Sequence, residues 1–343
     1  MVLGLGQKNA VIGLDIGSHE IKAIELTRSG DNFLVSGFAI GKISNPTDQK
    51  YAIKEVIRRG GFRTKKTVSA VSGRSVIVRY VNMLRMSEED LRSSIRFEAD
   101  KYIPFEVDDV ILDCQILDTD EASSDEMKVL LVAAKRNMIK EHVEQIKEAG
   151  LVLTVVDYDA FALGNAFELR NLNSPLMEEQ DRVVALIDIG ASKTNINILK
   201  GNVSFFTREV YLAGNDFTEA IARRLGVDSE EAEKIKCDPG DQIAEVEDAV
   251  LPSLDDLGNE IHLSFDFYET QFEREVDDVF VSGGSSRLPG LERAFERIFE
   301  KKINFWDPLE SLQILEDRVD INLLKETAPQ LAIAVGLAAR MGY

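Results

Sequence analysis

Two short stretches of the chain combine an aspartate at a predicted strand end with a glycine in the following turn. Asp-Ile-Gly occurs at 15–17, inside VIGLDIGSHEIKAIEL, and again at 188–190, inside VALIDIGASKTNINIL. Glycine lets such a turn take positive φ and lets a ligand approach, and successive N–H groups there form an anion-binding concavity. The carboxylates of Asp15 and Asp188 would position Mg²⁺ or its water shell beside a phosphate. The repeated turn therefore predicts a polyphosphate held from two sides.

Further residues around these turns fit the same chemistry. Ser18 and Ser192 offer hydroxyls directly after the turns, and Lys22 and Lys193 add positive charge. A third glycine-rich segment, VFVSGGSSRLPGL at 279–291, follows an apolar strand and precedes a helix. Its paired glycines would allow flat, close approach of the backbone to a planar ligand such as adenine.

The elements that must position these turns repeat as well. Apolar runs at 11–16, 20–26 and 33–40 read as a three-strand meander, and the pattern restarts at 182–190. A sequence built of two related halves predicts an internal duplication. Inside the first half, the stretch 79–150 indicates a small α+β insertion whose first helix begins at Ser87. We expect a linker at 173–182 and a solvated hairpin connection at 118–126.

Composition excludes several classes of function. The 343-residue chain has a net charge of −20, which argues against a nucleic-acid backbone or an anionic lipid surface as partner. Its two cysteines and three histidines do not cluster, so we expect neither a disulfide framework nor a zinc site. The longest apolar run is nine residues and no signal peptide is recognised, so we expect a cytoplasmic protein without membrane insertion.

The motifs DIGSHEIK, DIGASKTN and SGGSSRLPG resemble the first phosphate, second phosphate and adenosine motifs of the actin, Hsp70 and sugar-kinase superfamily. The resemblance covers nearly the whole chain. It implies an α/β, actin-like (ribonuclease H-like) duplicated two-lobed fold that binds ATP or ADP with Mg²⁺. Residues 158–167 and 331–340 resemble the two connecting helices of that fold, in which Gly164 and Gly336 would allow a close crossing.

The resemblance also implies which residues bind the ligands. Asp15 and Asp188 would hold Mg²⁺ through water and position the attacking water. For a water-orienting carboxylate only Asp157 or Asp159 is available, so we expect slow hydrolysis or none. His19 is unusual at a phosphate turn, and a lone histidine is more often solvent-facing. The implied nucleotide-binding residues are Gly17, Ser18, His19, Lys22, Gly190, Ala191, Ser192, Lys193, Thr194, Gly214, Asn215, Glu233, Lys236, Gly283, Gly284, Ser285 and Leu288.

Within the superfamily, the insertion lies where the division protein FtsA and the type IV pilus assembly protein PilM carry an extra subdomain. The opening GLGQKNAVIGLDIGSHEIKAIEL and the segment FEADKYIPFEVDDVILDCQIL resemble the PilM family in particular. The chain ends LAARMGY, whereas FtsA ends in an amphipathic membrane helix. The division expected from this resemblance is a first lobe at 1–78 plus 151–175, an inserted subdomain at 79–150, and a second lobe at 183–343.

PilM resemblance implies partners and a location. It implies binding of the cytoplasmic N-terminal tail of the inner-membrane protein PilN in a groove beside the insertion. Other pilus platform or motor proteins are further implied partners, with recruitment to the inner membrane through a protein partner and a homo-oligomer as a possible state. Phe97 lies off the apolar stripe of its helix, so Phe97, Tyr102 and Phe105 are candidates for a partner surface or for packing on the insertion itself.

Two other functions fit the same fold. One is a filament-forming, FtsA-like cytoskeletal ATPase, which the missing membrane helix disfavours. The other is a phosphotransferase of the sugar-kinase type, which would require a catalytic carboxylate and a polar sugar pocket in the first half. No clear signature of such a pocket is found.

Overall fold

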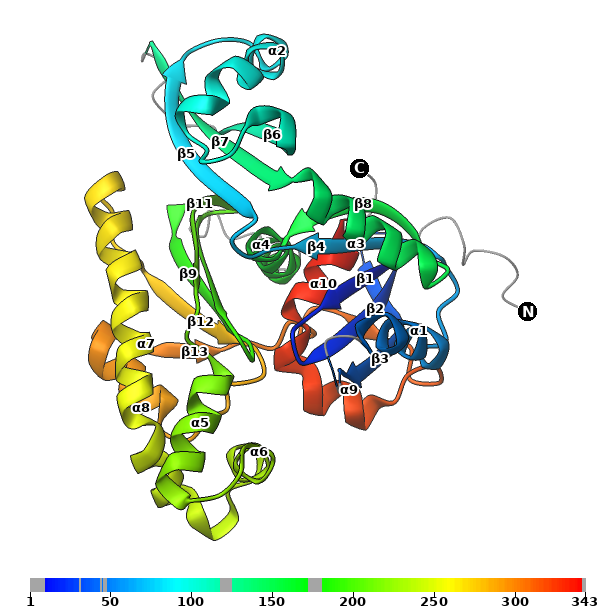
Figure 1. Cartoon of the computed structure of the whole chain (residues 1–343), viewed down its shortest axis with the longest axis vertical. Helices are drawn as coiled ribbons and strands as arrows, with labels where there is room; N and C mark the ends of the chain where they lie inside the picture. Colours follow the sequence, from blue (N-terminus) through cyan, green and yellow to red (C-terminus); the bar gives the residue numbers. More distant parts are fainter. Residues whose placement is uncertain are drawn as a thin grey trace.

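The computed structural model describes residues 10–30, 32–43, 45, 48–117, 125–171 and 181–340. The expected linker at 173–182 and the acidic loop at 118–126 lie almost wholly outside these residues. In the described part, two sheets lie on either side of helices α4 (Asp159–Asn171) and α10 (Ala332–Ala339), and a third sheet lies above them in Figure 1.

The first sheet has six strands and begins with the predicted antiparallel meander. Its strands run in the order β14-β3-β2-β1-β4-β8, with β4 parallel to β1 and β8 parallel to β4. Their bounds are β1 (Ala10–Ile16), β2 (Glu20–Ser29), β3 (Asn32–Lys42), β4 (Lys66–Val71), β8 (Val152–Tyr158) and β14 (Gln313–Ile314).

The second sheet repeats five strands of the first sheet in the same order. Its order is β11-β10-β9-β12-β13, in which β9, β10 and β11 form an antiparallel meander and β12 lies parallel beside β9. The bounds are β9 (Val183–Ile189), β10 (Thr194–Lys200), β11 (Val203–Val210), β12 (Asp278–Ser282) and β13 (Ile303–Phe305). Strands β3-β2-β1-β4-β8 thus match β11-β10-β9-β12-β13, which confirms the predicted duplication and fold class.

Helices cover both sheets because each sheet presents apolar side chains on both faces. On the first sheet, α1 (Gln49–Arg59) and α3 (Arg136–Glu148) share a core with β1 and β2, while α4 and α10 cover the opposite face. The second lobe buries a larger core under its own helices. These are α5 (Gly214–Leu225), α6 (Ser229–Cys237), α7 (Ile243–Phe272) and α8 (Leu291–Phe299).

The crossing of α4 and α10 depends on a glycine. A Cβ at Gly336 would lie 1.7 Å from the backbone oxygen of Ala162, which confirms the predicted close approach there. Gly164 faces strand β10 instead of α10, so the predicted pairing of two glycines at the crossing is wrong. The second close approach comes from Gly13 on β1, where a Cβ would lie 1.9 Å from a backbone oxygen of α10.

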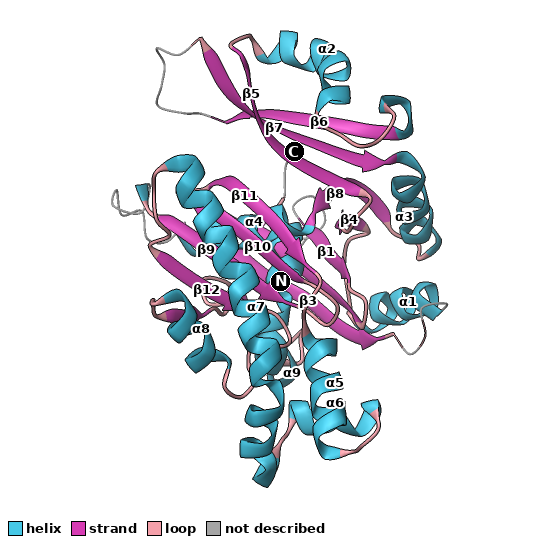
Figure 2. Ribbon diagram, turned by 60° about the vertical axis from the view of Figure 1, so that its left-hand side comes forward, coloured by secondary structure: helices cyan, strands magenta, loops and turns pink. Residues whose placement is uncertain are grey.

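The inserted module has its own sheet and core. Its strands β5 (Val76–Leu84), β7 (Glu126–Lys135) and β6 (Val110–Leu117) are antiparallel neighbours in that order, and α2 (Glu88–Glu98) packs on them. Figure 2 shows α2 on the outer side of this sheet. Ser87 caps α2 as predicted, accepting a hydrogen bond from the Asp90 amide. Helix α3 packs on the first lobe, so the module spans 76–135 and not the expected 79–150.

The end of the chain returns to the first lobe. Strand β14 pairs with β3, and after α9 (Ile321–Thr327) the final helix α10 packs on β1. In Figure 1 the red helix lies directly beside the blue strands. The expectation that 183–343 forms one lobe is therefore wrong for 313–340, because the apolar face of α10 is buried against the first sheet and α4.

Candidate functional site

A cavity of 300 Å³ lies between the two Asp-Ile-Gly turns, and we call it the hairpin cavity. Residues of both lobes line it, although the two turns lie far apart in the sequence. His19 is exposed and takes part in the lining. The predicted residues that line the cavity are Asp15, Gly17, Ser18, His19, Lys22, Asp188, Gly190, Ala191, Ser192, Lys193, Glu233, Lys236, Gly284 and Ser285.

The two turns have the same geometry and meet at their tips. The Gly17 amide donates to the Glu20 carbonyl at 3.0 Å, and the Gly190 amide donates to the Lys193 carbonyl, also at 3.0 Å. A Cβ at either glycine would lie 3.0 Å or less from that carbonyl oxygen, so the turns require glycine. The Ser192 hydroxyl donates to the Ser18 hydroxyl at 2.9 Å. The two anion-binding turns therefore face one cavity.

Buried carboxylates lie at the base of this cavity. Burial raises the pKa of Asp15 in spite of the Lys22 ammonium 3.0 Å away. Burial also raises the pKa of Asp188 to about 6; Lys22 and the Ser282 hydroxyl oppose this rise, and the negative charges of Asp15 and Asp159 add to it. Carboxylates held close together away from water favour a bound cation, because a cation stabilises their charged forms.

Lysines line the same cavity at several points. Lys22 lies against Asp15, and Lys193 Nζ contacts Asp159 at 2.8 Å and Glu209 at 3.0 Å. For Lys193 burial lowers the pKa, but the two carboxylates outweigh burial and raise it, so the side chain is charged. Ammonium groups and turn amides that face one cavity provide what a polyphosphate requires.

Helices α5 and α6 close one side of the cavity. Lys236 Nζ donates to Glu233 at 2.6 Å, to the Thr218 hydroxyl at 2.9 Å and to the Gly214 carbonyl at 3.1 Å. The Gly214 amide in turn donates to the Gly190 carbonyl at 3.0 Å. The Gly-Asn-Asp segment at 214–216 therefore supports the second turn from behind, and Lys236 with Glu233 lines the cavity.

Several predicted residues lie behind the lining and do not form part of it. Gly283 has φ +95°, and a Cβ there would meet the backbone of Ile189 at 2.4 Å, so this glycine fits the turn against β9. The Thr194 hydroxyl donates to the Leu212 carbonyl and faces the second-lobe core. The predicted residues absent from the lining are Thr194, Gly214, Asn215, Gly283 and Leu288. Gly214, Asn215 and Gly283 contact the backbone of the second turn or of β9, and Leu288 belongs to the second-lobe core. Their contact with a nucleotide stays a prediction.

The lining also contains residues that sequence reasoning missed. Ile333 reaches the cavity from the start of α10, Gln330 from the short 3₁₀ turn just before α10, and Lys42 from the end of β3. No motif marks Gln330 or Lys42, because their elements contact the turns only in the folded chain. Ile333 lies in the predicted connecting helix at 331–340, which was not assigned to the site. The further unpredicted lining residues are Glu20, Asn195, Lys234 and Cys237.

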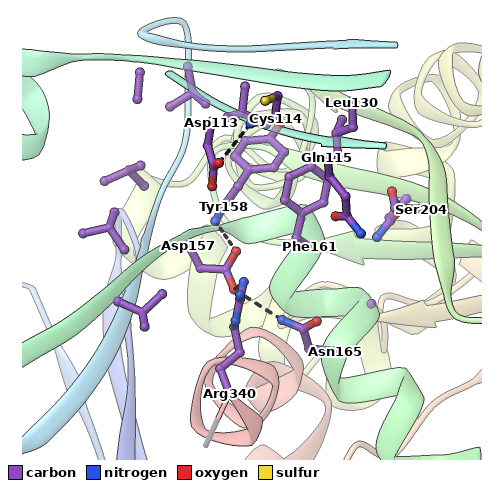
Figure 3. A pocket seen from close by; sticks show the side chains of 18 of the residues that line it. Asp113, Cys114, Gln115, Leu130, Asp157, Tyr158, Phe161, Asn165, Ser204 and Arg340 are labelled. Atoms are coloured by element: carbon purple, nitrogen blue, oxygen red, sulfur yellow. Dashed lines mark hydrogen bonds and ion pairs between the residues drawn. The ribbon is translucent and has the colours of Figure 1, made fainter. Parts of the chain in front are cut away.

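Of the two candidate water-orienting carboxylates, the structure places Asp159 in the hairpin cavity and Asp157 elsewhere. Asp157 accepts from Arg340 Nη1 at 2.9 Å and from Asn165 Nδ2 at 3.3 Å (Figure 3). Asp157 therefore lies outside the hairpin cavity, and Asp159 is the candidate that lines it. Strand β8 ends here and α4 begins, and this change of backbone direction turns Asp157 and Asp159 to different cavities.

A second cavity of 640 Å³ lies where the module meets both lobes, and we call it the module cavity. Strands β6 and β7 of the module, β8 and α4 of the first lobe, and β10 and β11 of the second lobe all contribute. Figure 3 shows Tyr158 and Phe161 directed into it. Their ring centroids are 5.2 Å apart in an edge arrangement. Apart from Asp113, Asp157 and Arg340, its lining is uncharged and largely apolar.

The three aromatic residues predicted as a partner surface do not line the module cavity. Phe97 is 81% exposed on α2, as its position off the apolar stripe indicates. Tyr102 and Phe105 pack against the module's own core, and Lys135 Nζ lies 4.6 Å from the centroid of the Phe105 ring. For Tyr102 and Phe105 the structure therefore favours the alternative of packing on the module.

The residues present fit a Mg²⁺ ion only together with a phosphate. Within the described residues, no three His, Cys, Asp or Glu side chains gather closely enough to hold a metal ion. Mg²⁺ usually keeps several waters and binds one or two carboxylates plus substrate phosphates. Asp15 and Asp188 provide two such carboxylates beside the anion-binding turns.

No described helix is long and apolar enough to cross a bilayer.

The duplicated sheets, the paired turns and the connecting helices define the class: this is an actin-like fold. The structure superposes on MreB5 of Spiroplasma citri bound to ADP with a TM-score of 0.51 and 12% identity, covering 96% of this chain and 94% of that one. The cell division protein FtsA of Bacillus subtilis is 24% identical over 256 residues, which are 66% of this chain and 57% of FtsA.

More specific matches give the family. A family model described as type IV pilus assembly protein PilM matches residues 13–342. The chain therefore belongs to the type IV pilus assembly protein PilM family. A solved PilM-PilN type IV pilus biogenesis complex contains a chain with a TM-score of 0.84 and 29% identity, covering 96% of this chain and 98% of that one.

Proposed function

We propose that this chain is an ATP-binding, actin-like adaptor of the type IV pilus inner-membrane assembly platform. In this proposal it works in the cytoplasm and is recruited to the inner membrane through a protein partner. The observation that carries the nucleotide part is the meeting of two Asp-Ile-Gly turns across the hairpin cavity, with Ser18 and Ser192 in contact. An MreB of the same fold is bound to ADP in its crystal structure, which supports a nucleotide as ligand.

In this proposal, different lining residues bind different parts of the nucleotide. The amides and hydroxyls after Gly17 and Gly190 would hold the phosphates from two sides. Asp15 and Asp188 would hold Mg²⁺ through its water shell. Lys236 and Glu233 from α6 would reach the ribose and base, with Gly284 and Ser285 on the opposite side. Their positions around one cavity support this assignment.

Slow hydrolysis, or none, fits the charges in the cavity. Asp159 is the carboxylate at the start of α4 that reaches the hairpin cavity, and Lys193 Nζ lies 2.8 Å from it. In this structure the Lys193 ammonium occupies Asp159 and Asp157 does not line the cavity, so neither candidate carboxylate is unengaged beside the phosphate turns. A phosphotransferase of the sugar-kinase type would require such a carboxylate.

We further propose that the module cavity binds the N-terminal cytoplasmic segment of PilN. The cavity is largely apolar and sits beside the module, and β6 is an edge strand of the module sheet. Edge strands and apolar cavities are common binding sites for extended peptides. The similarity to a chain of the PilM-PilN complex over nearly the whole length supports PilN as the partner.

The first test is calorimetric titration of the full chain with a synthetic peptide of the PilN cytoplasmic tail, with and without Mg-ATP. Binding of both ligands would support the adaptor proposal. If Mg-ATP binds and the peptide does not in either condition, the partner proposal fails while the nucleotide proposal stands.

A substitution in the module cavity makes the test specific. Ile111 is 41% exposed on β6 and lines the cavity, so Ile111→Glu can fold and still put a charge where the peptide packs. We expect the peptide to bind roughly 10–100-fold more weakly, because a buried charge in an interface core is costly. Leu84→Glu, at a 71% exposed position of the same sheet outside the cavity, is the matched control. Equal losses in both variants would place the peptide elsewhere.

A further inference from the structure

One carboxylate lies between the hairpin cavity and the module cavity. Glu209 is on β11 of the second lobe, and its side chain is 8% exposed. Its Oε1 accepts from Lys193 Nζ at 3.0 Å, and Lys193 lines the hairpin cavity. Glu209 is not itself part of the hairpin-cavity lining. Glu209 therefore reaches the hairpin cavity through Lys193.

On its other side Glu209 holds the entrance to the module. The Gly73 amide donates to both Oε1 and Oε2 of Glu209 at 3.0 Å each, although the two residues are 136 positions apart. Gly73 has φ +89° in the turn between β4 and β5, and Val71 and Val76 at the two ends of this turn line the module cavity. A shift of Glu209 would therefore move the cavity wall.

A second contact points the same way. Tyr158 lines the module cavity and is buried, and its pKa is raised well above the ordinary value by burial and then by the negative charges of Glu209 and Asp159. The next residue, Asp159, shares Lys193 with Glu209. Both carboxylates that hold Lys193 are thus adjacent to groups of the module cavity.

Because of these contacts, we propose that Glu209 couples the two cavities, with Lys193 as its sensor of the bound nucleotide. This inference rests on the proposed function. A polyphosphate in the hairpin cavity competes with Glu209 and Asp159 for the Lys193 ammonium. A buried carboxylate that loses its cation is strongly destabilised, so Glu209 shifts toward solvent and releases the Gly73 amide. The module cavity then departs from the shape described above.

The coupling has a definite sign. The module cavity with Glu209 bound to Gly73 belongs to the state in which Lys193 is held by carboxylates. Mg-ATP therefore lowers the affinity of the chain for a peptide that fits this cavity. By reciprocity, the peptide lowers the affinity for Mg-ATP by the same factor. We expect a factor of about five or more, the lower end of the range for coupled sites.

Hydrogen–deuterium exchange of the full chain tests the mechanism without the peptide. Mg-ATP should speed deuterium uptake in fragments covering 71–76 by about fivefold in the wild type, the same factor as in the coupling. Binding of Mg-ATP is measured on the same sample by calorimetry. Mg-ATP binding with unchanged uptake at 71–76 overturns the coupling alone. Absence of Mg-ATP binding overturns both the coupling and the nucleotide proposal.

Glu209→Gln separates the coupling from binding. Glutamine keeps an acceptor for the Gly73 amide but loses the charge that attracts Lys193, so Mg-ATP should still bind and its effect on 71–76 should fall below about twofold. Glu260→Gln is the control, since Glu260 pairs with the neighbouring β11 residue Arg208 at 2.6 Å and lines neither cavity. A wild-type response in Glu209→Gln, or its loss in both variants, overturns the proposal. If Glu209→Gln does not fold, the wild-type exchange alone decides.

Discussion

The hairpin cavity and the module cavity share the junction of β8 and α4 as a wall, yet they are built from opposite kinds of residues. The first holds buried carboxylates and lysines between two glycine turns, and the second is lined mainly by aliphatic and aromatic side chains. Asp157 and Asp159, two positions apart, face different cavities. The difference shows that one junction between a strand and a helix can form the wall of a charged cavity on one side and of a largely apolar cavity on the other.

The largest expected effect is a loss of stability at the crossing of α4 and α10, which supports both cavities. Gly336→Ala places a Cβ 1.7 Å from the backbone oxygen of Ala162, and α10 cannot move away because Gly13 holds it equally closely on β1. We expect a loss of more than about 4 kcal/mol in the free energy of unfolding, since backbone cannot yield as a side chain does. Chemical denaturation measures it.

The control for this change is another glycine near the ligands. At Gly284 the nearest atom to a new Cβ is 3.7 Å away, an ordinary contact, so Gly284→Ala should retain the wild-type stability. A Gly336→Ala protein as stable as Gly284→Ala would show that α4 and α10 do not form a rigid wall. In that case the two cavities could not be treated as parts of one framework.

A second substitution should separate the cavities. Ser192→Asp puts a negative charge at the tip of the second turn, where the phosphates are proposed to bind. Two charges about 4 Å apart near a protein surface repel by about 4 kcal/mol, which corresponds to roughly a thousandfold weaker binding of Mg-ATP. Calorimetry should show that the PilN peptide binds as tightly as to the nucleotide-free wild type.

Ser93→Asp, on the exposed face of α2, carries the same charge change far from the cavity and serves as the control. If both variants bind Mg-ATP equally weakly, the net charge of the chain, already −20, governs nucleotide affinity. The turns would then lose their assigned role.

The contrast between the cavities also explains what the sequence could predict. A glycine turn after an aspartate is a local device, so the residues of both Asp-Ile-Gly turns could be assigned to one cavity from their repetition. The duplicated meander was predictable for the same reason. Gln330 and Lys42 reach that cavity from elements whose approach depends on tertiary packing, and no local pattern marks them. Asn195 lies inside the DIGASKTN motif but was not assigned to the site.

The module cavity was accessible only through resemblance to a family. Its walls come from strands and helices between Val71 and Arg340, and each contributes one or a few side chains whose spacing looks like ordinary core. The opposite orientations of Asp157 and Asp159 depend on where β8 ends and α4 begins, and element boundaries are the least predictable feature of a sequence. Return of the final helix to the first lobe was missed because chain order suggested the second.

The smallest expected effect is a pH dependence of stability that comes from the buried carboxylates of the hairpin cavity. The pKa of Asp188 is raised to about 6 in the folded chain, mainly by burial, against 3.8 as its ordinary value. The folded state therefore keeps a proton that the unfolded state has released. This contribution to stability is fully present below about pH 4 and is lost as the pH rises through 6, which amounts to about 3 kcal/mol.

Asp188→Asn should remove this loss, so the variant gains stability relative to the wild type as the pH rises from 4 to 7, while it binds Mg-ATP more weakly. Denaturation curves at several pH values measure the difference. Asp181→Asn is the control of opposite sign, because exposed arginine and lysine partners lower the pKa of Asp181. Saturating Mg-ATP should flatten the wild-type slope, since a cation beside Asp188 stabilises its charged form. A slope unchanged by Mg-ATP would mean that the ion does not reach Asp188, and the hairpin cavity would then hold phosphate by its turns and lysines alone.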